Sequence, residues 1–206
     1  LVRFYLEHVL QNYVPELAFP LIISFQEYAS NPAINADLTG FSVKSEAQGF
    51  IVAYPAGTGN PLVWYTLHEI QDGAPDNVEF IDKMIDQLMV DYNIDPTRIY
   101  VTGFSNGGGM ANRVACDLSE RVAAVAIVAG GHFKDDSCDP EQAVPILAYH
   151  ARLDTEVLYE GGDLTVGIPD WSLEWAERNG CEMTPIDESD TDVPMNVVSW
   201  RDCRGE

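Results

Sequence analysis

The sequence predicts an α/β domain in which helices cover a mainly parallel central sheet. Short continuous apolar runs, typical of strands buried on both faces, alternate along the chain with segments of helical spacing. This alternation favours right-handed crossovers between parallel strands. A length of 206 residues corresponds to about one domain, and no repeat or low-complexity linker interrupts it. Residues 1–206 are therefore expected to form a single domain.

Three strands are predicted in the first part of the chain. Residues 3–10 alternate loosely between apolar and polar side chains, as in an edge strand, whereas residues 19–25 form the continuous apolar run of a buried parallel strand. Residues 50–55 repeat that run and end at a proline. The polar stretch between the two buried strands has helix-compatible spacing over residues 38–47.

The clearest helix follows Asp76. Asp76 and Glu79 are spaced like a capping box at its start. The Asp95-Pro96 pair is expected to end the helix before a strand over residues 98–102. Apolar residues recur through the helix at intervals of three and four, namely Val78, Ile81, Ile85, Leu88 and Met89.

The second half of the chain is expected to continue the alternation of strands and helices. Residues 123–129 and 145–150 are apolar runs that predict two further buried strands. A helix is predicted over residues 171–178, and a final short strand over residues 195–200.

The most informative segment is Gly103-Phe104-Ser105-Asn106-Gly107, which lies between a predicted strand and a helix that begins near Asn106. A G-x-S-x-G sequence in that position is typical of a strained turn that holds a nucleophilic serine above a sheet, with glycines where side chains would collide. Ser105 is therefore the predicted nucleophile, and the alternative is a glycine-rich turn with an idle serine. Catalysis also needs an acid and a base, in the chain order Ser, Asp or Glu, His.

The charge balance excludes several partner classes. There are 33 acidic and 11 basic residues, which give a net charge of −22. Such a charge repels phosphate backbones and anionic lipid, so neither nucleic acid nor a membrane is expected as a partner. The acidic residues are scattered, which favours a solvated surface over a dedicated cation site. No apolar run approaches the roughly 20 residues needed to cross a bilayer.

The four cysteines indicate the redox environment in which the protein works. No pair has the C-x-x-C spacing of zinc or thioredoxin-like sites, so two disulfides are the simplest solution, and four buried thiols are the alternative. Three pairings are open, of which the sequential one closes two loops of modest length. Disulfides indicate an oxidising, extracellular compartment. The four residues are Cys116, Cys138, Cys181 and Cys203.

Residues 98–108 and 112–116 resemble the secreted polyhydroxybutyrate depolymerase and feruloyl or acetylxylan esterase family of α/β-hydrolases. The resemblance implies the α/β-hydrolase fold and a serine esterase that works through an acyl-enzyme, with no metal or organic cofactor. Its implied substrates are feruloyl or acetyl esters of polysaccharides, or short polyesters. Further segments in the family's order extend the resemblance over most of the chain, namely residues 48–55, 123–130, 159–162 and 175–181.

By the same resemblance the catalytic acid is Asp154, which is also the carboxylate that directly follows a buried strand downstream of Ser105. The family's catalytic histidine lies beyond the last strand. Of the four histidines here, only His132 is placed to face the site, and it precedes Asp154, against the usual order. His150 matches a strand-end histidine of the family, for which a hydrogen-bonding role is expected. We therefore expect residues 1–206 to lack the last strand and the segment that carries the base.

The resemblance places the oxyanion hole at the backbone N–H groups of Asn106 and Tyr28. Where the family has a His-Gly pair before the aromatic residue, this chain has Gln26-Glu27. A carboxylate there would oppose the negative charge that develops on the substrate, and a non-glycine residue restricts the backbone. We expect either that Glu27 points away from the site or that the enzyme is weak.

Two functions remain open on the sequence alone. The first is an extracellular serine esterase, whose acyl preference would depend on the loops around Trp64, Tyr65 and Trp171. The loop over residues 57–73 either lines its pocket or covers the sheet. The second is a catalytically impaired α/β-hydrolase-like binding module, which the altered oxyanion loop and the missing base favour.

Overall fold

A computed structural model describes residues 2–66, 76–134, 138–189 and 195–204. Its centre is one six-stranded sheet made of β1 (Tyr5–His8), β2 (Phe19–Phe25), β3 (Ile51–Pro55), β4 (Ile94–Phe104), β5 (Ala124–Val128) and β6 (Ile146–Tyr149). The order across the sheet is β1-β3-β2-β4-β5-β6. β1 is antiparallel to β3, and the other neighbours are parallel. The predicted mainly parallel sheet is confirmed.

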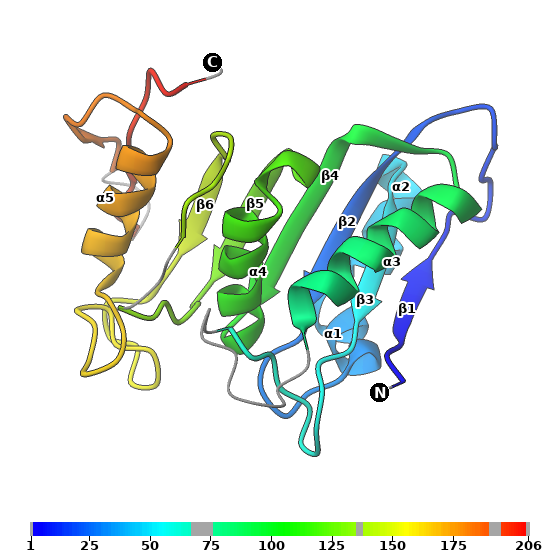
Figure 1. Cartoon of the computed structure of the whole chain (residues 1–206), viewed down its shortest axis with the longest axis horizontal. Helices are drawn as coiled ribbons and strands as arrows, with labels where there is room; N and C mark the ends of the chain where they lie inside the picture. Colours follow the sequence, from blue (N-terminus) through cyan, green and yellow to red (C-terminus); the bar gives the residue numbers. More distant parts are fainter. Residues whose placement is uncertain (1, 67–75, 135–137, 190–194, 205–206) are drawn as a thin grey trace.

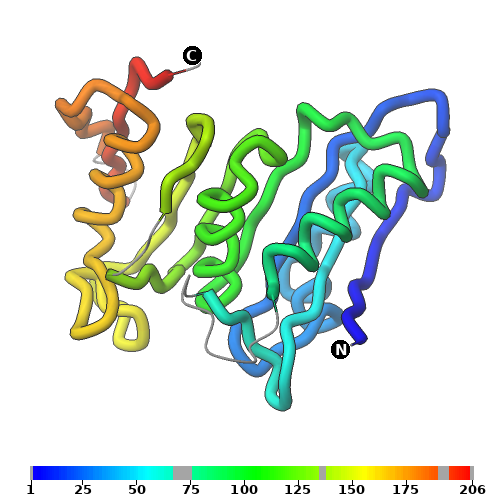
Figure 2. Tube along the Cα trace, viewed as in Figure 1, coloured from blue at the N-terminus to red at the C-terminus, as the bar shows by residue number. Residues whose placement is uncertain are grey.

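Helices cover the sheet on both sides (Figure 1). One side carries α3 (Asn77–Asp91), α4 (Asn106–Asp117) and α5 (Ile168–Arg178), and the other carries α1 (Pro32–Thr39) and α2 (Phe41–Gln48) against β2 and β3. A short 3-10 helix, Ser119–Arg121, follows α4. The α/β-hydrolase type of layering predicted from the sequence is present, and the Cα trace in Figure 2 follows its crossovers from blue to orange.

The larger core lies between the sheet and α3, α4 and α5. It contains the inward-facing residues of the central strands, such as Ile23, Val101 and Ile127, each at most 1% exposed. A smaller cluster of Phe50, Val52 and Tyr54 lies on the opposite face under α1 and α2. On that face, beyond these two helices, apolar side chains of β4, β5 and β6 are exposed, namely Tyr100, Phe104, Val128, Leu147 and Tyr149.

Two predicted elements have different limits in the structure. The helix expected over residues 38–47 is two helices, because Gly40, at φ 61°, ends α1 through an N–H bond to the carbonyl of Ala36. The strand expected over residues 98–102 begins earlier, at Ile94, and includes Pro96; its pairing with β2 shifts register between Phe19 and Leu21.

The last predicted strand is short and lies outside the main sheet. β8 (Val198–Ser199) pairs antiparallel with β7 (Ile186–Asp187) as a separate two-stranded unit. In contrast, Asp76 caps α3 as expected, since its carboxylate accepts from the N–H of Glu79 at 2.9 Å.

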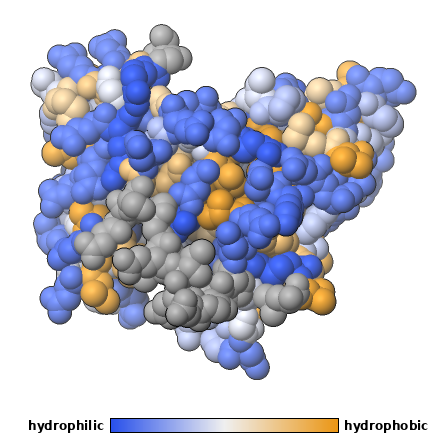
Figure 3. Space-filling view, viewed as in Figure 1, coloured by the Kyte–Doolittle hydropathy of each residue, from blue (hydrophilic) through white to orange (hydrophobic). Residues whose placement is uncertain are grey.

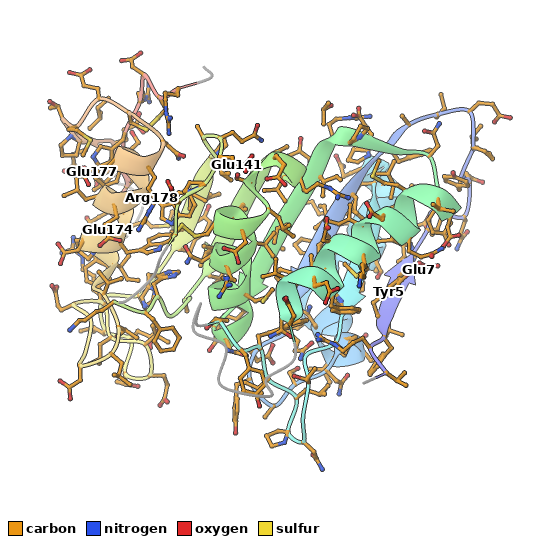
Figure 4. The ribbon with its side chains drawn as sticks, viewed as in Figure 1. Tyr5, Glu7, Glu141, Glu174, Glu177 and Arg178 are labelled. Carbon is orange, nitrogen blue, oxygen red and sulfur yellow. A yellow bond between two sulfur atoms is a disulfide. The ribbon has the colours of Figure 1, made fainter. Side chains whose placement is uncertain are left out.

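The surface is polar and its acidic residues are dispersed. Hydrophilic side chains dominate the face seen in Figure 3. Glu7 lies on β1 and Glu174 and Glu177 lie on α5, at opposite ends of the sheet (Figure 4). Glu174 pairs with Arg178 one turn further along α5, at 3.2 Å. No helix in the described ranges has the length and apolarity needed to cross a membrane.

Candidate active site

Ser105 lies in the sharp turn between β4 and α4. Its φ of 53° and ψ of −117° are unusual for a residue with a side chain, and such strain, about 1–3 kcal/mol, is concentrated at functional sites. Its N–H donates to the carbonyl of Val128 at 2.9 Å, and its own carbonyl accepts from the N–H of Gly109 at 3.1 Å. The turn is thus held by β5 on one side and by the first turn of α4 on the other, as in a nucleophile elbow.

The glycines on either side of Ser105 are required by close backbone contacts. A Cβ at Gly103 would lie 2.1 Å from the carbonyl oxygen of Gly107. A Cβ at Gly107 would lie 2.4 Å from the carbonyl oxygen of Phe25 and 2.6 Å from that of Gln26. No side chain fits at either position, as the sequence predicts. The second contact also shows that the start of α4 is packed directly against the chain leaving β2.

The carboxyl ends of β4, β5 and β6 place the candidate residues at one edge of the sheet. The N–H of Ser105 bonds to the last residue of β5, and the N–H of Ala129 bonds to Tyr149, the last residue of β6. Neighbouring strands lie about 4.8 Å apart, so the backbones of β4 and β6 are about 10 Å apart. Ser105 and the loop after β6 therefore leave the same edge of the sheet, from strands that are separated by β5.

Asp154 lies in the loop after β6, and the backbone fixes one of its oxygens. Its Oδ1 accepts from the N–H groups of Glu156 and Val157, both at 2.9 Å. These two bonds, Val157 first, hold the pKa of the Asp154 carboxyl below its ordinary value, with a smaller contribution from the charge of His150. Asp154 is therefore a carboxylate at neutral pH, which is the form that orients a catalytic imidazole.

His150 is hydrogen-bonded to the loop that contains Asp154. Its Nε2 lies 2.8 Å from the carbonyl oxygen of Val157, and because a carbonyl only accepts, Nε2 carries the hydrogen. The same Nε2 is 3.6 Å from Oδ2 of Asp154, and the side chain is 4% exposed. The hydrogen-bonding role expected for His150 agrees with this geometry.

His132 is poorly suited to be the base. It is 3% exposed, and its ring stacks on Trp171 with centroids 4.0 Å apart. Burial, and secondarily repulsion from His150, lowers the pKa of His132 to about 3. An imidazole with that pKa accepts a proton weakly at neutral pH.

The remaining two histidines add no base to the described site. His8 lies on β1 at the far edge of the sheet, where its Nε2 is 2.8 Å from Glu46. His68 lies outside the described residues. Within the described ranges, no histidine is hydrogen-bonded to Ser105.

The segment predicted to carry the second oxyanion donor follows β2. Gln26 is fully buried, and its amide, oriented to satisfy both ends, donates to the carbonyl of Pro55 at 2.9 Å and accepts from the N–H of Gly57 at 3.1 Å. Tyr28 is 59% exposed. Oε2 of Glu27 is buried and has no hydrogen-bond partner among the described residues. The Gln26-Glu27 pair therefore turns its first side chain into the protein and leaves one oxygen of the second unsatisfied.

Two of the three aromatic residues expected to shape an acyl pocket are core residues. Trp64 and Trp171 are 2% and 3% exposed, whereas Tyr65 is 43% exposed. In its described part, to residue 66, the loop that starts at residue 57 covers the sheet through Trp64, which packs edge-on against Phe25 at 5.1 Å. The sequence left this choice open because an aromatic residue in a loop suits either role.

The structure contains two disulfides, Cys116–Cys138 and Cys181–Cys203. The first joins α4 to the segment before β6, and the second joins the segment after α5 to the end of the described chain. In the described residues, no group of three or more His, Cys, Asp or Glu side chains is arranged to hold a metal ion.

The sheet order and the strained serine turn define a protein of the α/β-hydrolase fold. Residues 60–164, half of the chain, match the Dienelactone hydrolase family, and the chain belongs to this family. Over 214 aligned residues it is 28% identical to feruloyl esterase B of Piromyces equi, an alignment that covers 94% of this chain and 38% of that protein. It is 29% identical over 120 residues to poly(3-hydroxyalkanoate) depolymerase C of Paucimonas lemoignei, covering 56% of this chain and 28% of that one.

Solved structures agree on the fold. An acetyl xylan esterase from Aspergillus awamori superposes with a TM-score of 0.67 at 18% identity, over 90% of this chain and 77% of that one. A thermostable esterase gives a TM-score of 0.62 at 25% identity, over 76% of this chain and 44% of that one. The predicted resemblance to feruloyl and acetylxylan esterases and to depolymerases is confirmed. The chain spans only 20–48% of the length of the first curated relatives it matches.

Proposed function

We propose that this protein is a serine esterase that cleaves carboxylic esters through an acyl-enzyme. The observation that carries the proposal is the backbone of Ser105, whose strained conformation is enforced by the flanking glycines and by a hydrogen bond to β5. Such strain is concentrated at functional sites, and a half-buried serine in a turn of this kind is where a hydrolase nucleophile lies.

Each group of the candidate site has a defined role in the proposed reaction. An imidazole between Ser105 and Asp154 removes the hydroxyl proton as Oγ attacks the ester carbon, and Asp154 stabilises the imidazolium that forms. The N–H groups of Asn106 and Tyr28 bind the tetrahedral oxyanion. The imidazolium then protonates the departing alcohol, and water, deprotonated by the same imidazole, releases the acid.

The names of the relatives support the substrate class. They include feruloyl esterases, a bifunctional acetylxylan esterase/xylanase and a poly(3-hydroxyalkanoate) depolymerase, all of which act on esters of carboxylic acids. We propose feruloyl or acetyl esters of polysaccharides, or short polyesters, as substrates. The two disulfides favour secretion, because such bonds persist in oxidising compartments.

A second function, an impaired binding module, is favoured by one specific observation. The buried, unpartnered oxygen of Glu27 lies in the segment that would supply an oxyanion donor, and a negative charge there opposes the developing oxyanion. Neutralising this side chain separates the two functions. If the charge impairs an otherwise competent site, Glu27→Gln raises turnover of a simple ester.

The test of the proposal is hydrolysis of p-nitrophenyl acetate by the full-length protein and its Ser105→Ala variant. Loss of the nucleophile is expected to lower kcat by a factor on the order of a million, the scale seen when a catalytic serine is removed. Thermal unfolding of both proteins checks that the fold is retained. Equal turnover by the two proteins would remove Ser105 from the mechanism.

A further inference from the structure

The side chain of Asn106 makes two hydrogen bonds with the main chain of Trp64. Its Oδ1 accepts from the backbone N–H of Trp64 at 2.8 Å, and its Nδ2 donates to the carbonyl of the same residue at 3.0 Å. A single amide thus satisfies both polar groups of one residue, in the way a neighbouring strand would. The residue directly after Ser105 is therefore tied to a loop that is 42 residues away in sequence.

The side chain of Trp64 continues the connection to the other half of the site. Its indole N–H donates to the carbonyl oxygen of Gln26 at 3.1 Å, and its ring packs against Phe25 at the end of β2. Tyr28 lies two residues after Gln26. The N–H of the next residue, Ala29, donates to the carbonyl of Leu62 in the Trp64 loop at 2.9 Å. Trp64 is 2% exposed, and its indole hydrogen bond to Gln26 is buried.

We infer that Trp64 is a positioning residue for the oxyanion hole, a strut that fixes the spacing between the N–H of Asn106 and the N–H of Tyr28. This inference rests on the proposed function, because it takes these two N–H groups as the oxyanion donors. Each donor belongs to a different segment, one on α4 and one after β2. Trp64 is hydrogen-bonded to both segments, by its main chain to the first and by its indole to the second.

The role of the strut explains why an aromatic residue with a polar end occupies this place. Oxyanion stabilisation depends on donors that are preorganised at the correct separation. If the donors must move during the reaction, the free energy of that rearrangement reduces the stabilisation of the transition state. A buried hydrogen bond resists such movement, since breaking it leaves two groups without partners. Phenylalanine would fill only part of the same volume, and it would leave the carbonyl of Gln26 without this donor.

The chain offers a matched control. Trp175 is likewise buried, at 3% exposed, and its indole N–H donates to a buried oxygen, Oδ1 of Asn112, at 2.9 Å. Trp171 donates to the same oxygen at 3.0 Å. Trp175→Phe thus removes an indole hydrogen bond of similar length and burial, but from the contact between α5 and α4 rather than from the oxyanion segments.

The first experiment compares Trp64→Phe with Trp175→Phe in the full-length protein, using p-nitrophenyl acetate. We expect Trp64→Phe to lower kcat about tenfold to a hundredfold with KM changed less than about twofold, because donor spacing matters in the transition state and not in the ground state. Affinity for a trifluoromethyl ketone, whose adduct carries an oxyanion, is expected to fall in parallel. Trp175→Phe is expected to change the melting temperature and leave kcat and the ketone affinity within about twofold.

The second experiment tests the connection itself. Asn106→Ala keeps the backbone N–H but releases Trp64, and it is expected to lower kcat by a similar factor. If both bonds belong to one strut, the double variant with Trp64→Phe loses no more than the larger single loss. Multiplied losses would show two independent local effects and would overturn the inference.

Other outcomes are equally decisive. If Trp64→Phe has the kcat of the unchanged protein, the strut is overturned. The esterase function still holds in that case, provided that turnover is lost in Ser105→Ala. Should Trp64→Phe fail to unfold cooperatively, Asn106→Ala alone decides, and its unchanged kcat overturns the strut. Failure of the proposed function has a different signature, namely turnover that survives in Ser105→Ala.

Discussion

Substitution of Gly107 by alanine tests the contact between the start of α4 and the end of β2. The new Cβ would lie 2.4 Å and 2.6 Å from the carbonyl oxygens of Phe25 and Gln26. Ordinary van der Waals contact begins near 3.4 Å, so α4 and the chain after β2 must separate by about 1 Å. Both obstructing atoms are backbone, and no side-chain rotation relieves them.

The shift acts both on the Ser105 turn and on the segment after β2 that is proposed to hold an oxyanion donor. A displacement of about 1 Å in a catalytic site costs about a hundredfold in rate. Overpacking in a tight core costs about 1–3 kcal/mol, which for a chain of this length lowers the melting temperature by about 2–12 °C. Gly107→Ala is therefore expected to lose about a hundredfold in kcat while still folding.

The assay is p-nitrophenyl acetate hydrolysis with a thermal melt of each protein. Gly131→Ala is the control, because a Cβ there meets only Val157, at an ordinary 3.8 Å, although Gly131 follows β5 at the same edge of the sheet. Its kcat is expected to stay within about twofold of the unchanged protein. Equal activity and melting temperature in Gly107→Ala would refute the packing described between α4 and β2.

Three further predictions concern charge, pH and covalent structure. Asp154→Asn is expected to lower kcat by about ten-thousandfold in the ester assay, since an amide neither fixes the needed tautomer nor stabilises the imidazolium; a loss below tenfold would assign the acid elsewhere. The lowered pKa of His132, about 3 against about 6.5 when unfolded, means that the unfolded chain binds a proton first as pH falls. The contribution of His132 is complete above pH 6.5, and about 1.4 kcal/mol of stability is lost per pH unit between 6.5 and about 3. Urea unfolding of His132→Phe should lack this part of the pH dependence, and an unchanged dependence would contradict the burial of the ring. Replacing both Cys116 and Cys138 by alanine should cost about 3 kcal/mol in the same measurement, from a loop of 22 residues' separation, and no change would mean that the bond does not form.

The sequence predicts the sheet well because its strands are buried on both faces. The limits expected for residues 19–25 and 50–55 agree with β2 and β3 within one residue, since a continuous apolar run has only one stable place in a layered fold. The predictions that were wrong depend on single residues. Gly40 divides one helix into two, and Pro96 is accommodated in a strand because the register shifts opposite it.

The candidate site was predictable only where chemistry leaves a sequence motif. Ser105 and its glycines are recognisable because the turn excludes side chains. The role proposed for Trp64 was not predictable, because its hydrogen bonds join three segments that are distant in sequence, and two of these bonds use its main chain. A tryptophan in a loop gives no signal of whether its N–H reaches solvent or a buried carbonyl.

The most direct test of Ser105 as the nucleophile is covalent labelling of the full-length protein with a fluorophosphonate, followed by mass spectrometry of its peptides. A serine held in a nucleophile elbow and activated by a base reacts selectively with such a reagent. We expect one adduct, on Ser105, which disappears in Ser105→Ala together with ester turnover. An adduct on another residue that tracks activity, or turnover that persists with Ser105 unlabelled, would contradict the assignment of Ser105 as the nucleophile.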